Sequence, residues 1–213
     1  MKYLITLLFV FFISFTCVSQ DTIRLIHTNY TSVYSKTKKY PVLVEWWLTK
    51  NKVTCANPLP RIDKFTPDPL LREFTNLQDS YTKSGFDRGH MSPAADNQCS
   101  GKLVLEESFY FSNMSPQYHS LNAGDWKSLE TYSRNLSITM DSIKIFCGNL
   151  GEVKKIGQVS VPSKCWKVLY IKKTKKYHYF IFNNDTSKPD GFQNNEVTKE
   201  FFEKEVKIKI KAS

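Results

Sequence analysis

The sequence predicts an α+β fold with a largely antiparallel central sheet flanked by helices, and three observations support this prediction. Runs typical of strands gather near the start of the chain and again after its middle. Between them lies a segment with the apolar spacing of a helix. The chain has 213 residues, enough for one domain with a single good core and hardly enough for two. Strands grouped on both sides of a helical middle indicate an α+β arrangement.

Two strands are expected at the start of the chain, over Ile23–His27 and Pro41–Leu48. In the second run, large apolar or aromatic residues alternate with other residues, which turns one face of a strand toward a core. The alternating residues are Tyr40, Val42, Val44, Trp46 and Leu48.

The next part of the chain is expected to be mostly loop. Residues 55–80 are rich in Pro, Asp and Asn and predict a long surface loop, and such loops in compact domains are often functional. Residues 86–100 have turn-like composition, and Phe109–Ser112 is a short run typical of a strand.

A helix is expected over Asp125–Leu136, with Trp126, Leu129, Tyr132 and Ser133 on one side. The remaining elements have shorter patterns. They are expected strands at Ile143–Cys147, Lys167–Ile171 and Tyr177–Phe182, a late helix at Val197–Glu205, and a final strand at Val206–Ile210.

The first nineteen residues have the pattern of a signal peptide. Lys2 precedes an apolar run too short to span a bilayer comfortably, and small residues follow it. We expect cleavage before Gln20, with Cys17 at −3 and Ser19 at −1. A retained anchor and lipid attachment at Cys17 are the alternatives. Residues 20–213 would then form one exported domain, free of the membrane.

The composition is that of a globular protein, with 41% hydrophobic and 23% charged residues, so disordered and fibrous classes are excluded. The net charge is +10, and loss of residues 1–19 removes Lys2 and no acidic residue, which leaves +9. A surplus of this size favours a polyanionic partner such as nucleic acid. Charge that serves only solubility is the alternative, and charge alone does not decide between them.

Four cysteines remain after residue 19, and an even number in an exported chain predicts two disulfides. Three pairings are possible. We favour Cys147–Cys165, because each lies in or beside a strand-like run with a turn-rich stretch between them. The remaining pair, Cys55–Cys99, would tether the segments on either side of the motif described next. A zinc site is the competing interpretation, but the chain has no Cys-x-x-Cys spacing.

Two clusters carry residues suited to phosphate chemistry. The first is the run Asp87–Pro93, Asp-Arg-Gly-His-Met-Ser-Pro. The second is Phe111–Gln117, which is followed by a segment that runs from Leu121 to Glu130. A histidine can accept a proton near neutral pH, and an arginine offers a donor fork that fits phosphate oxygens.

The second cluster contains possible ligands for a cation. The carbonyl oxygen of Asn122 suits a hard cation such as Mg²⁺, which keeps several waters and needs few protein ligands. Glu130 follows eight residues later, about two helical turns, and so would face the same site. Taken singly, each residue has an ordinary structural explanation: a surface His90, a local Asp87–Arg88 ion pair, or Asn113 and Asn122 as turn residues.

The order and spacing of these clusters resemble the DNA/RNA non-specific endonuclease family, the Asp-Arg-Gly-His nucleases of the ββα-metal class that includes endonuclease G. The family signature is Asp-Arg-Gly-His, then Ser/Thr-Asn-x-x-Pro-Gln, then an Asn–Gly–Trp segment ending in Leu-Glu, and all of it is present. The loop around Arg61 and the run Val161–Val168 also resemble the family. The whole resemblance covers roughly residues 23–210. Cys165 departs from the pattern, since an aromatic residue is usual there.

The resemblance implies a role for each site residue. His90 would be the general base that takes a proton from the attacking water. Arg61 and Arg88 would stabilise the charge of the pentacovalent state, and Asn113 would orient His90 or the phosphate. The substrates would be both DNA and RNA, because attack by water needs no 2′-hydroxyl. Cleavage would not depend on sequence, and the products would carry 5′-phosphates.

The resemblance also implies one Mg²⁺, with Mn²⁺ as a substitute. Asn122 would be its direct protein ligand, while Glu130 and Asp87 would hold its waters. Lys172, Lys173, Lys175 and Lys176 would extend the surface that contacts the nucleic-acid backbone, unless they only form a solvated hairpin.

Two other functions compete with this expectation. A catalytically inactive nucleic-acid-binding domain would have lost His90, Asn122 or Glu130, and all three are present. A secreted adhesion module gives no reason for their spacing. Because Asn113-Met-Ser is a formal glycosylation sequon within the site, we expect a secreted or periplasmic bacterial protein. The oligomeric state is left open.

Overall fold

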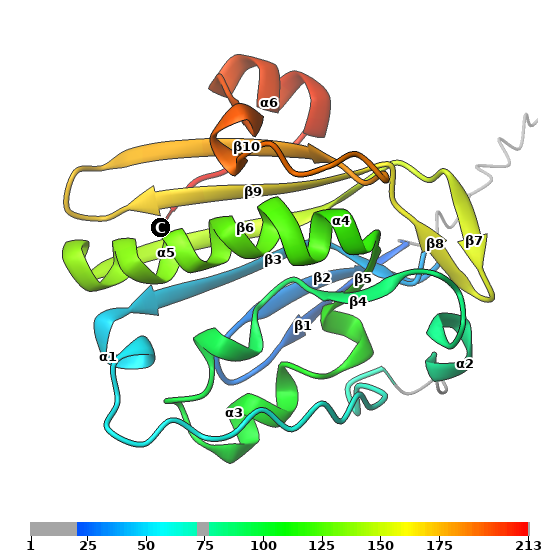
Figure 1. The fold of residues 1–213 in the computed structure, drawn as a ribbon, viewed down its shortest axis with the longest axis horizontal. Helices are drawn as coiled ribbons and strands as arrows, with labels where there is room; N and C mark the ends of the chain where they lie inside the picture. Colours follow the sequence, from blue (N-terminus) through cyan, green and yellow to red (C-terminus); the bar gives the residue numbers. More distant parts are fainter. Residues whose placement is uncertain (1–20, 72–76, 213) are drawn as a thin grey trace, which may run out of the picture.

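The computed structural model describes residues 21–71 and 77–212. Its centre is a seven-stranded sheet with the order β1-β2-β3-β6-β9-β10-β11, and every pairing in it is antiparallel (Figure 1). The predicted α+β class with a largely antiparallel sheet is therefore confirmed. The strands are β1 (Thr22–Ile26), β2 (Thr31–Ser35), β3 (Tyr40–Thr49), β6 (Ser142–Leu150), β9 (Lys164–Ile171), β10 (Lys176–Asn183) and β11 (Glu196–Val197).

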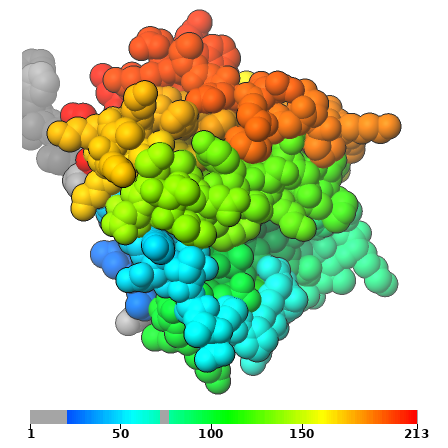
Figure 2. All heavy atoms as spheres, turned by 60° about the vertical axis from the view of Figure 1, so that its left-hand side comes forward, coloured from blue at the N-terminus to red at the C-terminus, as the bar shows by residue number. Residues whose placement is uncertain are grey.

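Helices cover both faces of this sheet. The longest, α5 (Lys127–Met140), lies along one face, and α6 (Lys199–Val206) packs on the other (Figure 1). In Figure 2, α5 forms a band across the surface, with the segment that follows β3 beneath it. The remaining helices are short: α1 (Lys50–Val53), α2 (Gln78–Tyr81), α3 (Lys102–Glu107) and α4 (His119–Leu121), with 3₁₀ turns at Ala94–Asp96, Phe111–Asn113 and Phe192–Asn195.

The alternation of the strands divides the core into two layers. Val44, Trp46 and Leu48 of β3 point toward α5 and pack with Leu129, as the alternation in the sequence predicts. On the other face, Trp166 of β9 packs at the centre of a second layer against α6. The main sheet is thus buried on both faces over its middle strands.

A second, two-stranded sheet carries the Asp-Arg-Gly-His run. It pairs β4 (Asp87–His90) with β5 (Met114–Gln117), antiparallel and in register from Asp87 opposite Gln117 to His90 opposite Met114. The chain then passes through α4 and a π-helical segment, Asn122–Trp126, called here the π turn, into α5. The order is β4, β5 and helix, which is a ββα arrangement. A small hairpin of β7 (Lys154–Ile156) and β8 (Val159–Val161) lies at the edge of this unit.

Three sequence predictions of local structure were wrong, and some short strands were not predicted. Residues 86–100 are not all turn, because Asp87–His90 pairs as β4, and Phe109–Ser112 is mostly 3₁₀ turn rather than strand. Strand β2 was missed. Val206–Ile210 forms no strand, because α6 continues to Val206 and Lys207 has the left-handed backbone that ends it (φ 58°).

The cysteines are paired differently from the prediction in one of two cases. Cys55 and Cys99 form a disulfide, as predicted. Cys147 and Cys165 are free and buried, so the predicted Cys147–Cys165 bond is wrong. They lie on neighbouring strands, but Cys147 is opposite Lys167, two residues from Cys165. Such diagonal neighbours are typically about 7–8 Å apart, beyond the usual span of a disulfide.

The predicted signal peptide, residues 1–19, lies outside the described residues. In the part of the chain that the structure describes, no helix is both long and apolar enough to cross a membrane.

Candidate active site

Five of the residues singled out in the sequence line one pocket of about 310 Å³: Arg61, Arg88, His90, Asn122 and Glu130. They come from three places that are far apart in the sequence. Arg61 belongs to the loop between α1 and α2, Arg88 and His90 to β4, and the other two to the π turn and α5. The fold therefore brings five of the seven predicted catalytic and metal-site residues into one pocket.

His90 is almost completely buried, with 8% of its surface exposed. Its ring lies 5.0 Å from that of Phe109 and 5.7 Å from that of Phe65, measured between centroids. Burial, with a smaller contribution from the positive charge of Arg61, lowers the pKa of His90 to about 3. Within the described residues its Nε2 is buried and has no hydrogen-bond partner. A neutral imidazole with a free ring nitrogen is what proton acceptance requires.

Both arginines lie over aromatic rings, and Arg61 also forms an ion pair with Asp63. The Arg88 guanidinium lies 5.3 Å from the ring of Phe65 and 5.5 Å from the ring of Tyr81, and its Nε is buried without a partner. Arg61 lies 5.3 Å from the ring of Phe109, and its Nε is 2.5 Å from Oδ1 of Asp63. Both are placed to bind an anion beside His90.

Asn122 and Asp87 are joined by a hydrogen bond. Nδ2 of Asn122 donates to Oδ2 of Asp87 over 2.8 Å, which leaves the carbonyl oxygen of Asn122 as its available ligand atom. The same Asp87 oxygen lies 2.8 Å from Nδ1 of the exposed His119. Asp87 is not among the residues that line the pocket. Asp87 therefore orients the Asn122 side chain through this hydrogen bond, from outside the pocket.

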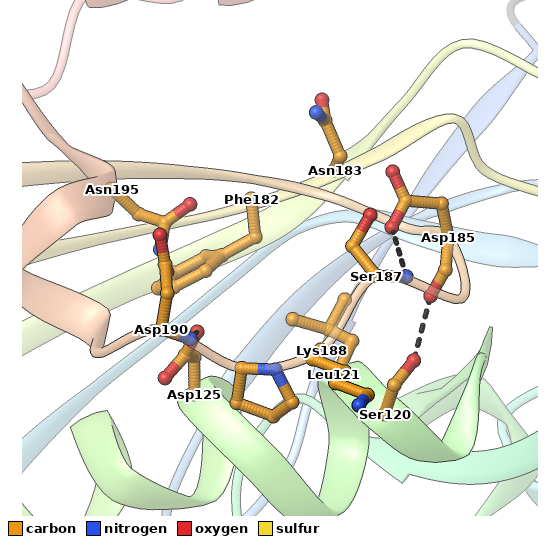
Figure 3. Close-up of a pocket in the computed structure, with 11 residues that line it drawn as sticks. Ser120, Leu121, Asp125, Phe182, Asn183, Asp185, Ser187, Lys188, Asp190 and Asn195 are labelled. Carbon is orange, nitrogen blue, oxygen red and sulfur yellow. Dashed lines mark hydrogen bonds between the residues drawn. The ribbon is translucent and has the colours of Figure 1, made fainter.

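The backbone around Asn122 is held by the segment after β10. Gly124 has non-helical dihedrals, and a Cβ there would lie 2.3 Å from Cγ of Pro189. The carboxylate of Asp125 accepts hydrogen bonds from the backbone N–H groups of Asp190 and Gly191. Figure 3 shows this segment over the helix, with Ser120 donating to the carbonyl of Asp185. This packing fixes the π turn that presents Asn122.

Gly89, the glycine of the Asp-Arg-Gly-His run, is required by a close approach. An added Cβ would lie 2.0 Å from Oε1 of Gln117, the residue at the other end of the motif on β5. Gln117 is fully buried, and its Nε2 donates to Sγ of Cys165 in the main sheet. The two motifs therefore interlock, since the small residue of one makes room for the large residue of the other.

Asn113 is fully buried and does not line the pocket. Its Oδ1 accepts from the backbone N–H of Ser92, and its Nδ2 donates to the carbonyls of Ser92 and Ser108. These bonds hold the chain that follows His90. Asn113 was expected to orient the His90 ring or the phosphate directly. In the structure its side chain bonds to the backbone of Ser92 and Ser108.

Glu130 is one of the pocket residues, with 14% of its side chain exposed. Burial raises its pKa to about 7, against the opposing effect of Lys167, whose Nζ lies 3.8 Å from Oε1. Arg134, which sequence reasoning missed, lines the same pocket one helical turn later and pairs with Asp96 over 3.2 Å. Its i, i+4 spacing from Glu130 was the available signal.

The lysines of the β9–β10 turn do not line the pocket. Lys172, Lys173 and Lys175 lie in the exposed turn that joins the two strands, as the hairpin alternative predicts, and Lys176 begins β10.

The oxygen donors in the pocket fit one hydrated hard cation. They are the free carbonyl of Asn122 and the carboxylate of Glu130. Among residues 21–71 and 77–212, no group of three or more His, Cys, Asp or Glu side chains is arranged to hold a metal ion. A cation with few protein ligands, as Mg²⁺ prefers, is compatible with this site, whereas a structural zinc centre is not.

Comparison with known proteins identifies the family of the chain. A model of the family described as DNA/RNA non-specific endonuclease matches residues 12–212. The mitochondrial nuclease EXOG of Danio rerio is 35% identical over 162 residues, which is 69% of this chain and 47% of that protein. The human EXOG is 32% identical over 163 residues, 70% of this chain and 44% of that protein.

A "Nuclease" of the cyanobacterium Nostoc sp. is 30% identical over 162 residues, covering 73% of this chain and 57% of that protein. The chain spans about half the length of the curated relatives it matches.

The fold is also similar to a solved one. The crystal structure of the EndoG/EndoGI complex aligns with a TM-score of 0.79 and 24% identity, over 88% of this chain and 84% of that one. This likeness shows the shared fold. Because the family model covers nearly the whole chain, the chain belongs to the DNA/RNA non-specific endonuclease family.

Proposed function

We propose that the chain is an endonuclease that depends on a divalent metal and hydrolyses phosphodiester bonds of DNA and RNA without regard to sequence. The observation that carries this proposal is the pocket that holds a neutral, buried His90 together with two arginines and two oxygen donors. Residues from a loop, a strand and a helix converge there.

His90 would act as the general base. The free Nε2 of a neutral imidazole can take a proton from a water molecule as that water attacks phosphorus. The aromatic rings around it keep the imidazole uncharged. The support of the following backbone by Asn113 holds the ring at a fixed place in the pocket.

Arg61 and Arg88 would bind the scissile phosphate and stabilise the charge that builds up on it. The free Nε of Arg88 is buried beside the pocket, so its contact with a phosphate oxygen would form in a partly dehydrated site. Arg134 adds a third guanidinium to the same wall.

Asn122 would hold the cation directly, with Glu130 beside it and Asp87 fixing the Asn122 amide. When bound, Mg²⁺ or Mn²⁺ supplies positive charge to the phosphate and to the leaving 3′-oxygen. The 3′-oxygen would depart and take up a proton from water, which leaves a 3′-hydroxyl on one product and a 5′-phosphate on the other.

The breadth of substrate has a physical basis. Phosphate contacts position a nucleic acid but carry no sequence information, and attack by water needs no 2′-hydroxyl. The residues that line the pocket are suited to phosphate rather than to base edges. The net charge of the chain, +10, favours association with any polyanion of this kind.

We also propose export, with residues 1–19 as a cleaved signal peptide and residues 20–213 as the active domain. The Cys55–Cys99 disulfide supports this, since such bonds persist in oxidising compartments. The EXOG relatives are named as mitochondrial proteins, so the compartment needs its own test. That test is N-terminal sequencing of the protein recovered from the culture medium or periplasm.

Digestion of supercoiled plasmid and of labelled RNA tests the activity. The purified protein should cut both with Mg²⁺ or Mn²⁺ and neither in excess EDTA. His90→Ala should cut about 10²–10⁴ times more slowly, the usual cost of losing a general base, while still binding DNA. Cleavage that persists in EDTA, or a His90→Ala rate above half that of the wild type, would disprove the assignment.

A further inference from the structure

Lys167 is a buried lysine in the middle of the main sheet, with 1% of its side chain exposed. On β9 it is paired in register with Cys147 of β6 and with Phe180 of β10, and it lies on the face covered by α5. Removing an ammonium group from water costs several kcal/mol unless a partner compensates it. A lysine at this position therefore calls for a specific explanation.

The partner is Glu130. Nζ of Lys167 lies 3.8 Å from Oε1 of Glu130 and 4.0 Å from the centre of the Trp126 ring. The neighbouring buried acid, Asp96, is already paired, because it accepts from Nη1 of Arg134 and from Nε1 of Trp46, each over 3.2 Å. Asp96 is therefore paired with Arg134, and Glu130 is the buried acid that pairs with Lys167.

Lys167 lies behind Glu130 relative to the pocket. Glu130, Asn122 and His90 line the pocket, whereas Lys167 does not. The lysine thus has no direct contact with the pocket, and Glu130 is the pocket residue that pairs with it. The short π turn and α5 carry both donors for the cation, while β9 anchors one of them from the opposite layer.

We propose that Lys167 is a positioning residue of the metal site: from the sheet, its charge holds the Glu130 carboxylate in the orientation in which Glu130 and Asn122 together receive the divalent cation. The inference rests on the proposed function. It adds a residue outside the ββα unit to the machinery, and it assigns the lysine an effect on metal affinity rather than on phosphate binding.

Stability alone does not explain the lysine. Replacement of a buried ion pair by apolar residues of similar size is often neutral or stabilising. A methionine or leucine at position 167 would match the apolar cluster between the sheet and α5. A purely structural role predicts that loss of Lys167 changes unfolding and leaves metal binding unchanged.

Mn²⁺ binding to the purified protein, followed by electron paramagnetic resonance without nucleic acid, tests the proposal. In Lys167→Met the dissociation constant for Mn²⁺ should rise about 10–100-fold, the usual cost of losing a group that orients a metal ligand. The concentration of Mn²⁺ that gives half-maximal cleavage should rise in parallel. The KM for DNA at saturating Mn²⁺ should stay within about twofold, an expectation based on the absence of Lys167 from the pocket.

Lys144→Met is the matched control. Lys144 is also a buried lysine of the main sheet, 11% exposed, and it pairs with Glu45 over 3.2 Å. It adjoins Trp47 and Phe146, on the face opposite α5. Its replacement removes a buried charge from the same sheet and should leave the Mn²⁺ dissociation constant unchanged.

A double-mutant cycle decides whether Lys167 acts through Glu130, and it applies even if the single variant folds poorly. Glu130→Gln and the double variant Glu130→Gln/Lys167→Met should bind Mn²⁺ equally, because the lysine has then lost the carboxylate that it positions. The proposal is overturned if folded Lys167→Met binds Mn²⁺ like the wild type, or if Lys167→Met weakens binding equally in both backgrounds.

Failure of the proposed function would look different. A wild-type protein that binds Mn²⁺ but cuts neither DNA nor RNA would contradict the nuclease assignment. The double-mutant cycle of Lys167 and Glu130 would still test the positioning role, because its readout is Mn²⁺ binding. His90→Ala serves as the reference here, since it should lose cleavage and retain Mn²⁺ binding.

Discussion

His90 shows how a common side chain acquires a special protonation state from its neighbours. Two aromatic rings and the Arg61 charge surround it, and together with burial they lower its pKa to about 3. An imidazole in water would be half protonated near pH 6.5. In the pocket it stays neutral over the whole physiological range, at the cost of being a weaker base.

This shift predicts how stability depends on pH. Between about pH 6.5 and pH 3 the unfolded chain binds a proton at position 90 and the folded chain does not. The free energy of unfolding should therefore decrease as the pH falls through this window, by at most about 1.4 kcal/mol per pH unit from this group. His90→Gln cannot gain that proton. Urea unfolding at a series of pH values with EDTA should show a shallower slope for His90→Gln, and equal slopes would refute the assigned shift.

At the scale of single residues, the motif spacing predicted most of the pocket. Arg61, Arg88, His90, Asn122 and Glu130 are together as expected. Arg134 was missed as a pocket residue, because its place there depends on how α5 packs against the sheet. Asn113 was expected to orient His90 or the phosphate directly. Its side-chain amide instead bonds to the backbone carbonyls of Ser92 and Ser108, a contact that depends on the fold.

At the scale of elements, the loop that carries Arg61 is the least regular part of the pocket and is fastened at both ends. The Cys55–Cys99 disulfide and two hydrogen bonds between Leu59 and Gln98 hold its start. A β-bridge between Thr66 and Tyr110 holds its end. Among the described residues, Arg61 itself contacts Asp63 and the Phe109 ring.

Loss of the disulfide should therefore lower both stability and catalysis. The double variant Cys55→Ser/Cys99→Ser should lose about 2–4 kcal/mol of unfolding free energy, the typical contribution of a native disulfide. The kcat should fall toward that of Arg61→Ala, because the loop no longer holds the guanidinium over Phe109. Urea unfolding and cleavage rates measure the two effects. A double variant with wild-type kcat would show that the loop is held by its other contacts.

The two strands of the ββα unit that the sequence failed to predict, β4 and β5, have a common cause. β4 and β5 are four residues each and contain Gly89 and Pro116, so their local composition is that of a turn. They pair because Gln117 fits over Gly89, which is a tertiary contact. Longer elements with strong periodicity, such as β3 and α5, were predicted correctly because their burial pattern is local.

At the scale of the whole molecule, the charge predicts a response to salt. Binding that arises mostly from phosphate neutralisation should weaken with added salt, by slightly under one logarithmic unit per unit of log salt for each phosphate contact on duplex DNA. Cleavage of one labelled duplex and one labelled RNA across a salt series should show this decline and a diffuse pattern of products. A flat response, or bands confined to one motif, would indicate that base edges are read directly.

The two free thiols of the main sheet can be used to measure unfolding of the protein. Cys147 and Cys165 are fully buried on the central strands β6 and β9, and burial raises the pKa of both thiols. A thiol reagent needs an exposed thiolate, so it can reach them only after these strands separate. Protein without residues 1–19 should thus label at two positions, at a rate set by the opening of the whole sheet. Rapid labelling under native conditions would mean that this layer opens locally.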